Sequence, residues 1–180
     1  MLKLTLLSLS VFFSTFLIAQ QQSFHGGIKL TNDLTFYHGW AGGFGALAIY
    51  KLGKHNGIES GIYYTNREHW LFLTPSAIVK GRQKRIYMPF LYRYESKVLN
   101  FTTGPILDFL AKWEVSEKLG DPNLIDYSWN TVDILSSVSV SKSIYISNRI
   151  SLEPEIRFNY SFSEKDGSAG INLAISKQLF

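Results

Sequence analysis

The chain has 180 residues, of which 18% are charged and 15% aromatic, and its formal net charge is +4. It contains no cysteine, which excludes a disulfide scaffold, a thiolate metal site, a cysteine nucleophile and a lipoprotein anchor. The basic residues are dispersed except for Lys80, Arg82, Lys84 and Arg85, which we interpret as a solvated loop, and we expect no nucleic-acid partner.

The N-terminus has the order of features of a cleaved secretory signal peptide. Lys3 precedes an apolar run over residues 4–18, and Ala19 is followed by three glutamines. A retained membrane anchor is the alternative, but serines and threonines interrupt the run, which is short for a span. We therefore expect residues 1–20 to be a signal peptide and residues 21–180 to form one domain. No later apolar run is long enough for a membrane helix, so a helical inner-membrane protein is excluded.

Three strands are expected in the first part of the domain, at residues 23–33, 42–52 and 57–66. The facing of the second strand stays open, because two sets of apolar residues compete for the same face. One set is Phe44, Ala46, Ala48 and Tyr50, and the other is Leu47 and Ile49.

Five further strands show clearer alternation of apolar and polar residues, at residues 86–95, 101–113, 132–144, 150–162 and 171–179. Residues 150–162 are the best case, with one wholly apolar and one wholly polar face. Eight strands use up the domain, and the fold expected is all-β, a closed antiparallel up-and-down transmembrane barrel. Closure is needed because a lipid-exposed strand edge would leave backbone groups unpaired in hydrocarbon.

In such a barrel the apolar rows face lipid and the polar rows face a narrow lumen filled by side chains. The residues expected to face lipid are Phe101, Leu107, Phe109, Ile150, Leu152, Ile156, Phe158 and Tyr160. The lumen is expected to hold a structural polar network of Lys29, Glu59, Arg93, Glu95, Asp108, Lys112, Asp133, Glu153, Glu155 and Arg157. Mixed signs favour paired charges over an ion path, because an unpaired buried charge costs several kcal/mol.

The connections are expected to alternate between tight and long. Tight turns are predicted near residues 54–57, where Asn56-Gly57 suits a primed hairpin turn, and at 96–99 and 147–149. Long loops are predicted at residues 34–41, 65–84, 113–130 and 163–170, on the side away from the termini. Pro89, Pro105 and Pro154 fall inside strands, where each removes a donor, so bulges are expected near them.

From residue 84 onward the chain resembles the outer-membrane β-barrel domain family that includes the PorT-like proteins. The resemblance lies in residues 86–94, 101–105 and 150–158, with Gly26-Gly27 and Gly42-Gly43 upstream. It implies an outer-membrane barrel of a Gram-negative cell, with secretion or motility accessories among the family, and it brings no catalytic residues. The terminal aromatic Phe180 is similar to a barrel assembly signal, although Gln178, Ser176 and Asn172 occupy its own row.

The function expected is a non-enzymatic outer-membrane barrel whose long loops contact a protein partner. Its other partners would be outer-membrane lipid and, during insertion, the barrel-assembly machinery; no metal or cofactor is expected. A soluble periplasmic lipocalin-type barrel with an apolar ligand is the main alternative, and it requires the apolar faces to turn inward. A lipid-modifying enzyme is a third. Its candidate bases are His25, His38, His55 and His69, and Ser23 could share a face with His25, but no nucleophile motif accompanies them.

Overall fold

The computed structural model describes residues 23–36, 39–74, 77–119 and 131–180, so the predicted signal peptide lies outside the described residues. The described residues form strands and turns, and none belongs to a helix of the length and apolar character needed to cross a membrane. In chain order the strands are β1 (Phe24–Thr35), β2 (Gly39–Lys51), β3 (Asn56–Thr74), β4 (Ala77–Glu95), β5 (Asn100–Leu119), β6 (Val132–Ser141), β7 (Ile144–Tyr145), β8 (Ile150–Ser161) and β9 (Asp166–Gln178).

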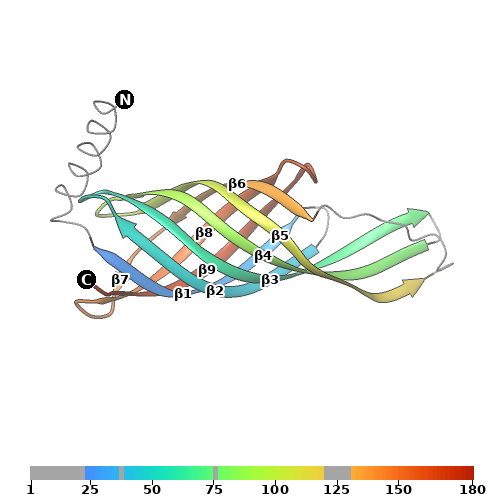
Figure 1. Ribbon diagram of the computed structural model, residues 1–180, viewed down its shortest axis with the longest axis horizontal. Coiled ribbons are helices and arrows are strands. Elements are labelled where there is room, and N and C mark those ends of the chain that lie inside the picture. Colours follow the sequence, from blue (N-terminus) through green and yellow to red (C-terminus); the bar gives the residue numbers. More distant parts are fainter. Residues whose placement is uncertain (1–22, 37–38, 75–76, 120–130) are drawn as a thin grey trace, which may run out of the picture.

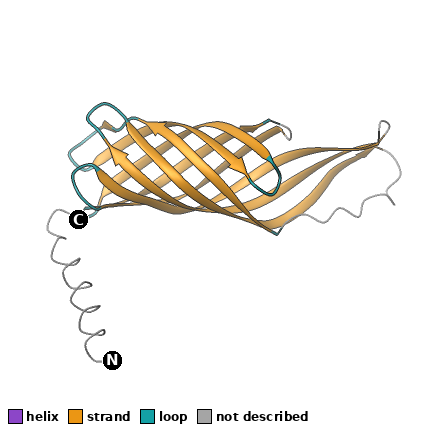
Figure 2. Cartoon of the chain, turned by 90° about the horizontal axis from the view of Figure 1, so that it is seen from above, coloured by secondary structure: helices purple, strands orange, loops and turns teal. Residues whose placement is uncertain are grey.

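Eight of these strands close into an antiparallel barrel in which each long strand pairs with its neighbour along the chain (Figure 1). The ring closes where β1 pairs with β9, for example at Ile28 and Ile175, and β7 is a two-residue addition beside the start of β8. The strands cross the barrel at a tilt, as Figure 2 shows. The predicted closed eight-stranded fold is confirmed.

Phe24, at the start of β1, meets Phe180 at one end of the barrel, which we call the terminal end. The amide of Phe24 donates to the carbonyl of Phe180 at 3.0 Å, and their rings stack with centroids 5.6 Å apart. The predicted tight turns at 96–99 and 147–149 lie between strands as expected. The first turn differs, because residues 52–55 form it while Asn56 and Gly57 begin β3. The Asn-Gly pair therefore has no role as a primed turn.

At the opposite end three of the four predicted long loops are largely strand. Residues 65–84 continue β3 and β4 as far as Thr74 and from Ala77, and β5 extends to Leu119. Residues 34–41 belong mostly to β1 and β2, and residues 163–170 mostly to β9. The polar and mixed composition that resembled loop sequence therefore belongs to the ends of strands. Residues 120–130, the rest of the remaining loop, lie outside the described residues.

The predicted bulges near the prolines are absent from the described strands, whose register stays constant across Pro89, Pro105 and Pro154. At Pro89 the backbone carbonyl accepts a hydrogen bond from the hydroxyl of Ser60 at 2.9 Å. The register shifts recorded lie instead near Phe72, Lys80 and Lys84, toward the extended ends of β3, β4 and β5.

The barrel is polar inside and apolar outside. In β8, Glu153, Glu155 and Arg157 are buried, whereas Ile156 and Phe158 are 55% and 56% exposed. The facing of β2, which the sequence left open, follows the same rule of an outer row and an inner row. Phe44 is exposed on the outer row, and Leu47 and Ile49 are buried against Ala174 on the inner row. This facing is opposite to that of a barrel around an apolar ligand, so the lipocalin-type alternative is wrong.

Candidate functional site: the sealed lumen and the projecting sheet

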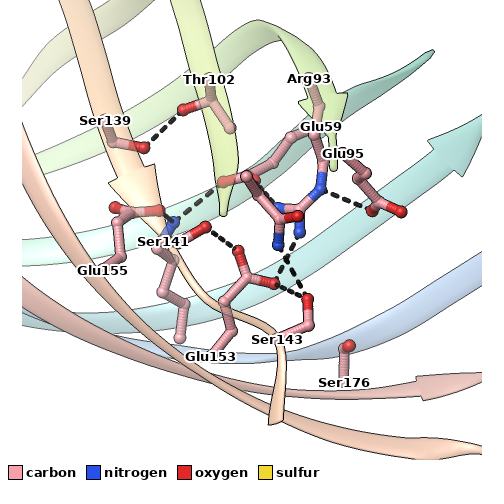
Figure 3. A network of polar contacts seen from close by, with 12 residues as sticks. Glu59, Arg93, Glu95, Thr102, Ser139, Ser141, Ser143, Glu153, Glu155 and Ser176 are labelled. Atoms are coloured by element: carbon pink, nitrogen blue, oxygen red, sulfur yellow. Dashed lines mark hydrogen bonds and ion pairs between the residues drawn. The ribbon is translucent and has the colours of Figure 1, made fainter. Parts of the chain in front are cut away.

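Four basic and four acidic side chains form a charge cluster in the terminal half of the lumen, which we call the inner cluster. Figure 3 shows the part of it around Arg93 and the four glutamates. The members of the cluster come from five strands, and their numbers balance, so the lumen carries no net charge there. Its members are Lys29, Lys51, Arg93, Arg157, Glu59, Glu95, Glu153 and Glu155.

Glu59 is at the centre of this cluster. Its carboxylate lies 2.9 Å from Lys29 Nζ, 2.9 Å from Arg93 Nη1 and 3.3 Å from Arg157 Nη2. Arg93 also contacts Glu153 at 2.6 Å, and Lys29 contacts Glu155 at 2.6 Å. These contacts join β1, β3, β4 and β8 across the lumen, so the cluster ties together strands that are not neighbours.

Neutral polar side chains complete the inner cluster. The hydroxyl of Ser141 donates to Glu153, and the amide of Asn172 donates to Glu155 at 2.8 Å. Thr102 and Ser139 bond to one another at 2.6 Å, as Figure 3 shows. Buried carboxylates are tolerated only when such bonds replace water.

A second polar group, the outer cluster, lies toward the other end. Arg85 bonds Asp108 at 2.6 Å, and Arg67 bonds Glu164 at 3.0 Å and the hydroxyl of Tyr87. Sequence reasoning missed Arg67 and Glu164, because residues 65–84 and 163–170 were interpreted as loops. Its assignment of Arg85 to a solvated basic loop is wrong, since Arg85 is fully buried in β4. The alternation of Gln83 and Arg85 with Lys84 was the signal that could have placed Arg85 inside.

A group of apolar side chains, which we call the apolar layer, lies between the two clusters on the side of the lumen formed by β3 to β6. Along β4 the buried residues run from Arg93 through Leu91 and Tyr87 to Arg85, so the layer interrupts the row of charges. The side chains of this layer are Tyr63, Tyr87, Leu91, Ile106 and Leu135. Two cavities lined by described lumen residues have volumes of about 10 Å³ each, roughly one water molecule. The described lumen is therefore filled.

The structure places the predicted lumen residues as follows. Glu95 is half-buried, and the others are buried in the lumen: Lys29, Glu59, Arg93, Asp108, Asp133, Glu153, Glu155 and Arg157. Asp133 belongs to neither ion-paired cluster and accepts bonds from Ser161 and Ser163. The prediction that Lys112 lies in the lumen is wrong, since its side chain is 64% exposed. A bulge at Ala111 reverses the facing, because Arg85 pairs with Leu110 while Lys84 pairs with Lys112.

The residues predicted to face lipid all lie on the outer surface of the barrel, exposed or half-buried: Phe101, Leu107, Phe109, Ile150, Leu152, Ile156, Phe158 and Tyr160. Phe180 is 76% exposed and lies beyond the end of β9. Leu179, its neighbour, is also exposed and continues the outward row of Ile171, Leu173 and Ile175.

The histidine candidates do not assemble an active site among the described residues. Ser23 Oγ and His25 Nε2 lie 3.2 Å apart, but no described carboxylate is within hydrogen-bonding distance of His25. His55 bonds the carbonyl of Glu95 at 2.8 Å and stacks on Tyr94, which is a turn-stabilising role. His38 lies outside the described residues. No group of three or more histidine, aspartate or glutamate side chains in the described part could hold a metal ion.

Three strands continue past the rim of the barrel, as Figures 1 and 2 show. The last pair of β2 with β3 is Ala41 with Arg67, and the last pair of β5 with β6 is Phe109 with Val132. Beyond these pairs β3, β4 and β5 still pair with one another, to Thr74, Ala77 and Leu119. We call this three-stranded extension, residues 68–74, 77–84 and 112–119, the projecting sheet. At its base Glu114 bonds Lys84 at 2.7 Å and Lys112 at 2.8 Å.

Comparison with known proteins identifies the fold. No family model matches the chain, and no curated protein matches it. Among solved structures, Ail, the attachment invasion locus protein of Yersinia pestis, in complex with the heparin analogue sucrose octasulfate, superposes with a TM-score of 0.51 at 8% identity. The match covers 88% of this chain and 97% of that one. Neisserial surface protein A matches with a TM-score of 0.47 at 15% identity over 88% of this chain and 97% of its own. The chain thus has the fold of a small eight-stranded outer-membrane β-barrel.

Proposed function

We propose that the protein is an integral outer-membrane barrel without enzymatic activity, whose filled lumen gives it rigidity and whose projecting sheet contacts a protein partner. The observation that carries the proposal is the inverted polarity of the barrel, with apolar side chains such as Phe158 outside and an ion-paired cluster inside. Only a bilayer gives such an apolar outer wall a favourable surrounding.

The structure of the lumen favours a structural role for the barrel over a role as a pore. A selective pore needs a wider bore and a ring of charges of one sign. The inner cluster has balanced charges, and the apolar layer and the outer cluster fill the bore behind it. In this proposal the barrel anchors the projecting sheet in the membrane, and the projecting sheet contacts the protein partner.

Cell fractionation combined with a heat-shift gel tests the location. We expect the mature chain in the outer-membrane fraction, with an apparent mass that changes on boiling because the folded barrel resists detergent. A product in the soluble periplasmic fraction without a heat-modifiable band would overturn the proposal.

The resemblance to the PorT-like proteins suggests a more specific role for the protein, as an accessory of secretion or motility. Deletion of the gene tests that form separately. Loss of surface secretion or of gliding, restored by the intact gene and not by one lacking the projecting sheet, would support it, while unchanged secretion and motility would contradict it.

A further inference from the structure

A groove lies on the outer wall of the barrel, where β1 to β4 approach the rim away from the terminal end. Its volume is about 650 Å³, which is within the range of pockets that bind small molecules. On β2 the groove is lined by Gly42 and Gly43, so no side chain fills the wall there. A Cβ built on Gly42 would lie 3.3 Å from the ring of Trp40, so this exposed ring lies over the glycine and forms one side of the groove.

The lining of the groove changes from apolar to polar along its length. Leu30, Phe44 and Tyr64 are opposite one another on β1, β2 and β3 and form the apolar part, and the rings of Phe44 and Tyr64 lie 6.2 Å apart. Glu68 and Arg82 are opposite one another on β3 and β4, nearer the rim, and form the polar part. The groove therefore matches a molecule with an apolar chain and a polar head.

The same change occurs on the neighbouring strands of the outer wall. The outward row of β4 changes from Ile86 to Lys84 and Arg82, and that of β5 changes from Phe109 to Lys112. Ile86 pairs with Phe109 and Lys84 pairs with Lys112, so the two strands change at the same point of their ladder. Lysine on the lipid face of a barrel is costly at the bilayer midplane and tolerated near the interface. The groove thus extends from the hydrocarbon region into the headgroup region.

The polar end of the groove has an excess of positive charge. Among the described side chains of this face, Arg82, Lys84 and Lys112 are three cations, whereas Glu68 and Glu114 are two anions. Glu114 is shared between the two lysines, at 2.7 Å and 2.8 Å. Arg82 is half-exposed and contacts Glu68 at 3.4 Å, which is long for a charge-assisted hydrogen bond. That described contact uses one donor of a guanidinium whose planar fork can bind a phosphate through two.

We propose that this groove binds one phosphate-bearing lipid of the outer membrane, with an acyl chain along Leu30, Phe44 and Tyr64 and the phosphate on Arg82. The apolar part accepts a chain of any lipid, whereas the charge-assisted hydrogen bonds of Arg82 select an anionic headgroup. The inference rests on the proposed function, since it requires the outer wall to face a bilayer.

A lipid fits the groove better than a segment of a protein partner. The apolar part of the groove lies at the level of the hydrocarbon, where a peptide backbone would leave its donors and acceptors unpaired. An acyl chain has no such groups, and its phosphate lies in the headgroup region with Arg82.

Native mass spectrometry of the folded mature protein, released from nonionic detergent micelles, tests the proposal. The probe is dioleoylphosphatidic acid, and dioleoylglycerol, which has the same chains and no phosphate, is its control. We expect the first molecule of dioleoylphosphatidic acid to bind at least about tenfold more tightly than dioleoylglycerol. Excess inorganic phosphate should not displace it, because free phosphate has no chain to fill the apolar part.

A matched pair of arginine variants tests the headgroup end. Arg82→Gln removes the charge, so it should weaken binding of dioleoylphosphatidic acid about tenfold and leave that of dioleoylglycerol unchanged. Arg149→Gln makes the same change in an exposed turn at the terminal end and should bind both lipids like the wild type.

A second pair tests the apolar part. Gly42→Leu fills the groove and should weaken binding of both lipids several-fold. Ala48→Leu adds a leucine to the outer wall of the same strand away from the groove and should weaken neither. A heat-modifiable band verifies that each of the four variants is folded.

Four results would overturn the inference: equal binding of the two lipids, displacement by inorganic phosphate, equal losses in Arg82→Gln and Arg149→Gln, or unchanged binding in Gly42→Leu. In each case a mature chain that still fractionates with the outer membrane would leave the proposed function standing. A chain found outside the membrane would overturn both.

Discussion

Arg93 shows how one residue can hold several strands of a narrow barrel together. It extends from β4 and contacts Glu59 of β3, Glu153 of β8 and Glu95 of its own strand, all within 2.9 Å. Its guanidinium has donors enough to serve three carboxylates at once, which an ammonium group does less well. Glu59 also contacts Lys29 and Arg157, and Glu95 also contacts Lys51, whereas Arg93 is the cation that the described contacts give Glu153.

The first prediction follows from that dependence. Arg93→Met keeps much of the volume but leaves three carboxylates short of a positive charge, and it should lower the free energy of unfolding by about 3–5 kcal/mol. Urea titration of the barrel in lipid vesicles measures the change. Lys84→Met removes a solvated outer ion pair and serves as the control, for which we expect little change. Equal effects of the two variants would mean that the inner cluster does not stabilise the fold.

Phe158 and Asn159 give the second prediction, since they are neighbours that occupy opposite faces of β8. Phe158→Arg puts a guanidinium on the apolar outer wall and should cost about 2–4 kcal/mol if that position is near the bilayer midplane. Asn159→Ser makes a small change inside the lumen and should cost much less. Reversible folding into vesicles compares them, and small, similar costs would contradict a lipid-facing position for Phe158.

At the residue scale, alternation alone was enough to find most of the lumen. The charged residues of residues 150–162 could be placed because seven apolar positions alternate with six polar ones without interruption. Lys112 could not be placed, because one extra residue at Ala111 reverses the facing and leaves no mark in the sequence. Which charges pair across the lumen depends on the stagger of the strands, and no local pattern carries that information.

The strands themselves were predictable where one face met an apolar surrounding and the other a polar one. β8 begins and ends within a residue of its expected bounds, and β6 begins at the expected Val132. The extended parts of β3, β4 and β5 leave the barrel, so they lose the alternation that identifies a strand and resemble loops in composition. The facing of β2 was undecided because its inner row contains Leu47 and Ile49, which pack on Ala174 in place of polar residues.

A close approach between β2 and β3 gives the third prediction. A Cβ built on Gly45 would lie 2.1 Å from the carbonyl oxygen of Ile62 and 2.6 Å from Cδ1 of Tyr63. Gly45→Ala must therefore push the strands apart or displace the Tyr63 ring of the apolar layer, at a cost of about 1–3 kcal/mol. Gly53→Ala, in the open turn with nothing within 4 Å, is the matched control and should fold like the wild type. The midpoint of heat modification on gels ranks the variants, and a tolerated Gly45→Ala would show that the packing there is looser than described.

At the scale of the whole molecule the barrel combines a rigid, filled body with an extension that the body does not cover. Closure removes every strand edge within the barrel, and the strand edges left open among the described residues of the long strands belong to the projecting sheet. The strand pairing therefore distinguishes a closed part, in which every long strand has two neighbours, from the three-stranded projecting sheet.

The last prediction concerns transport. The lumen is filled by the inner cluster, by the outer cluster and, on the side of β3 to β6, by the apolar layer of Tyr63, Tyr87, Leu91, Ile106 and Leu135. Removing the inner cluster leaves the other two in place. In planar bilayers we expect no steady ion current through the wild type, whereas a wide-bore porin inserted in the same way conducts. The double variant Glu59→Ala with Arg93→Ala removes one charge of each sign and opens space in the inner cluster. It should also fail to conduct, because ions would still meet the apolar layer and the ion-paired outer cluster. Stable current steps in the wild type would contradict a sealed lumen. Current in the double variant alone would show that the inner cluster is the barrier and that the apolar layer leaks.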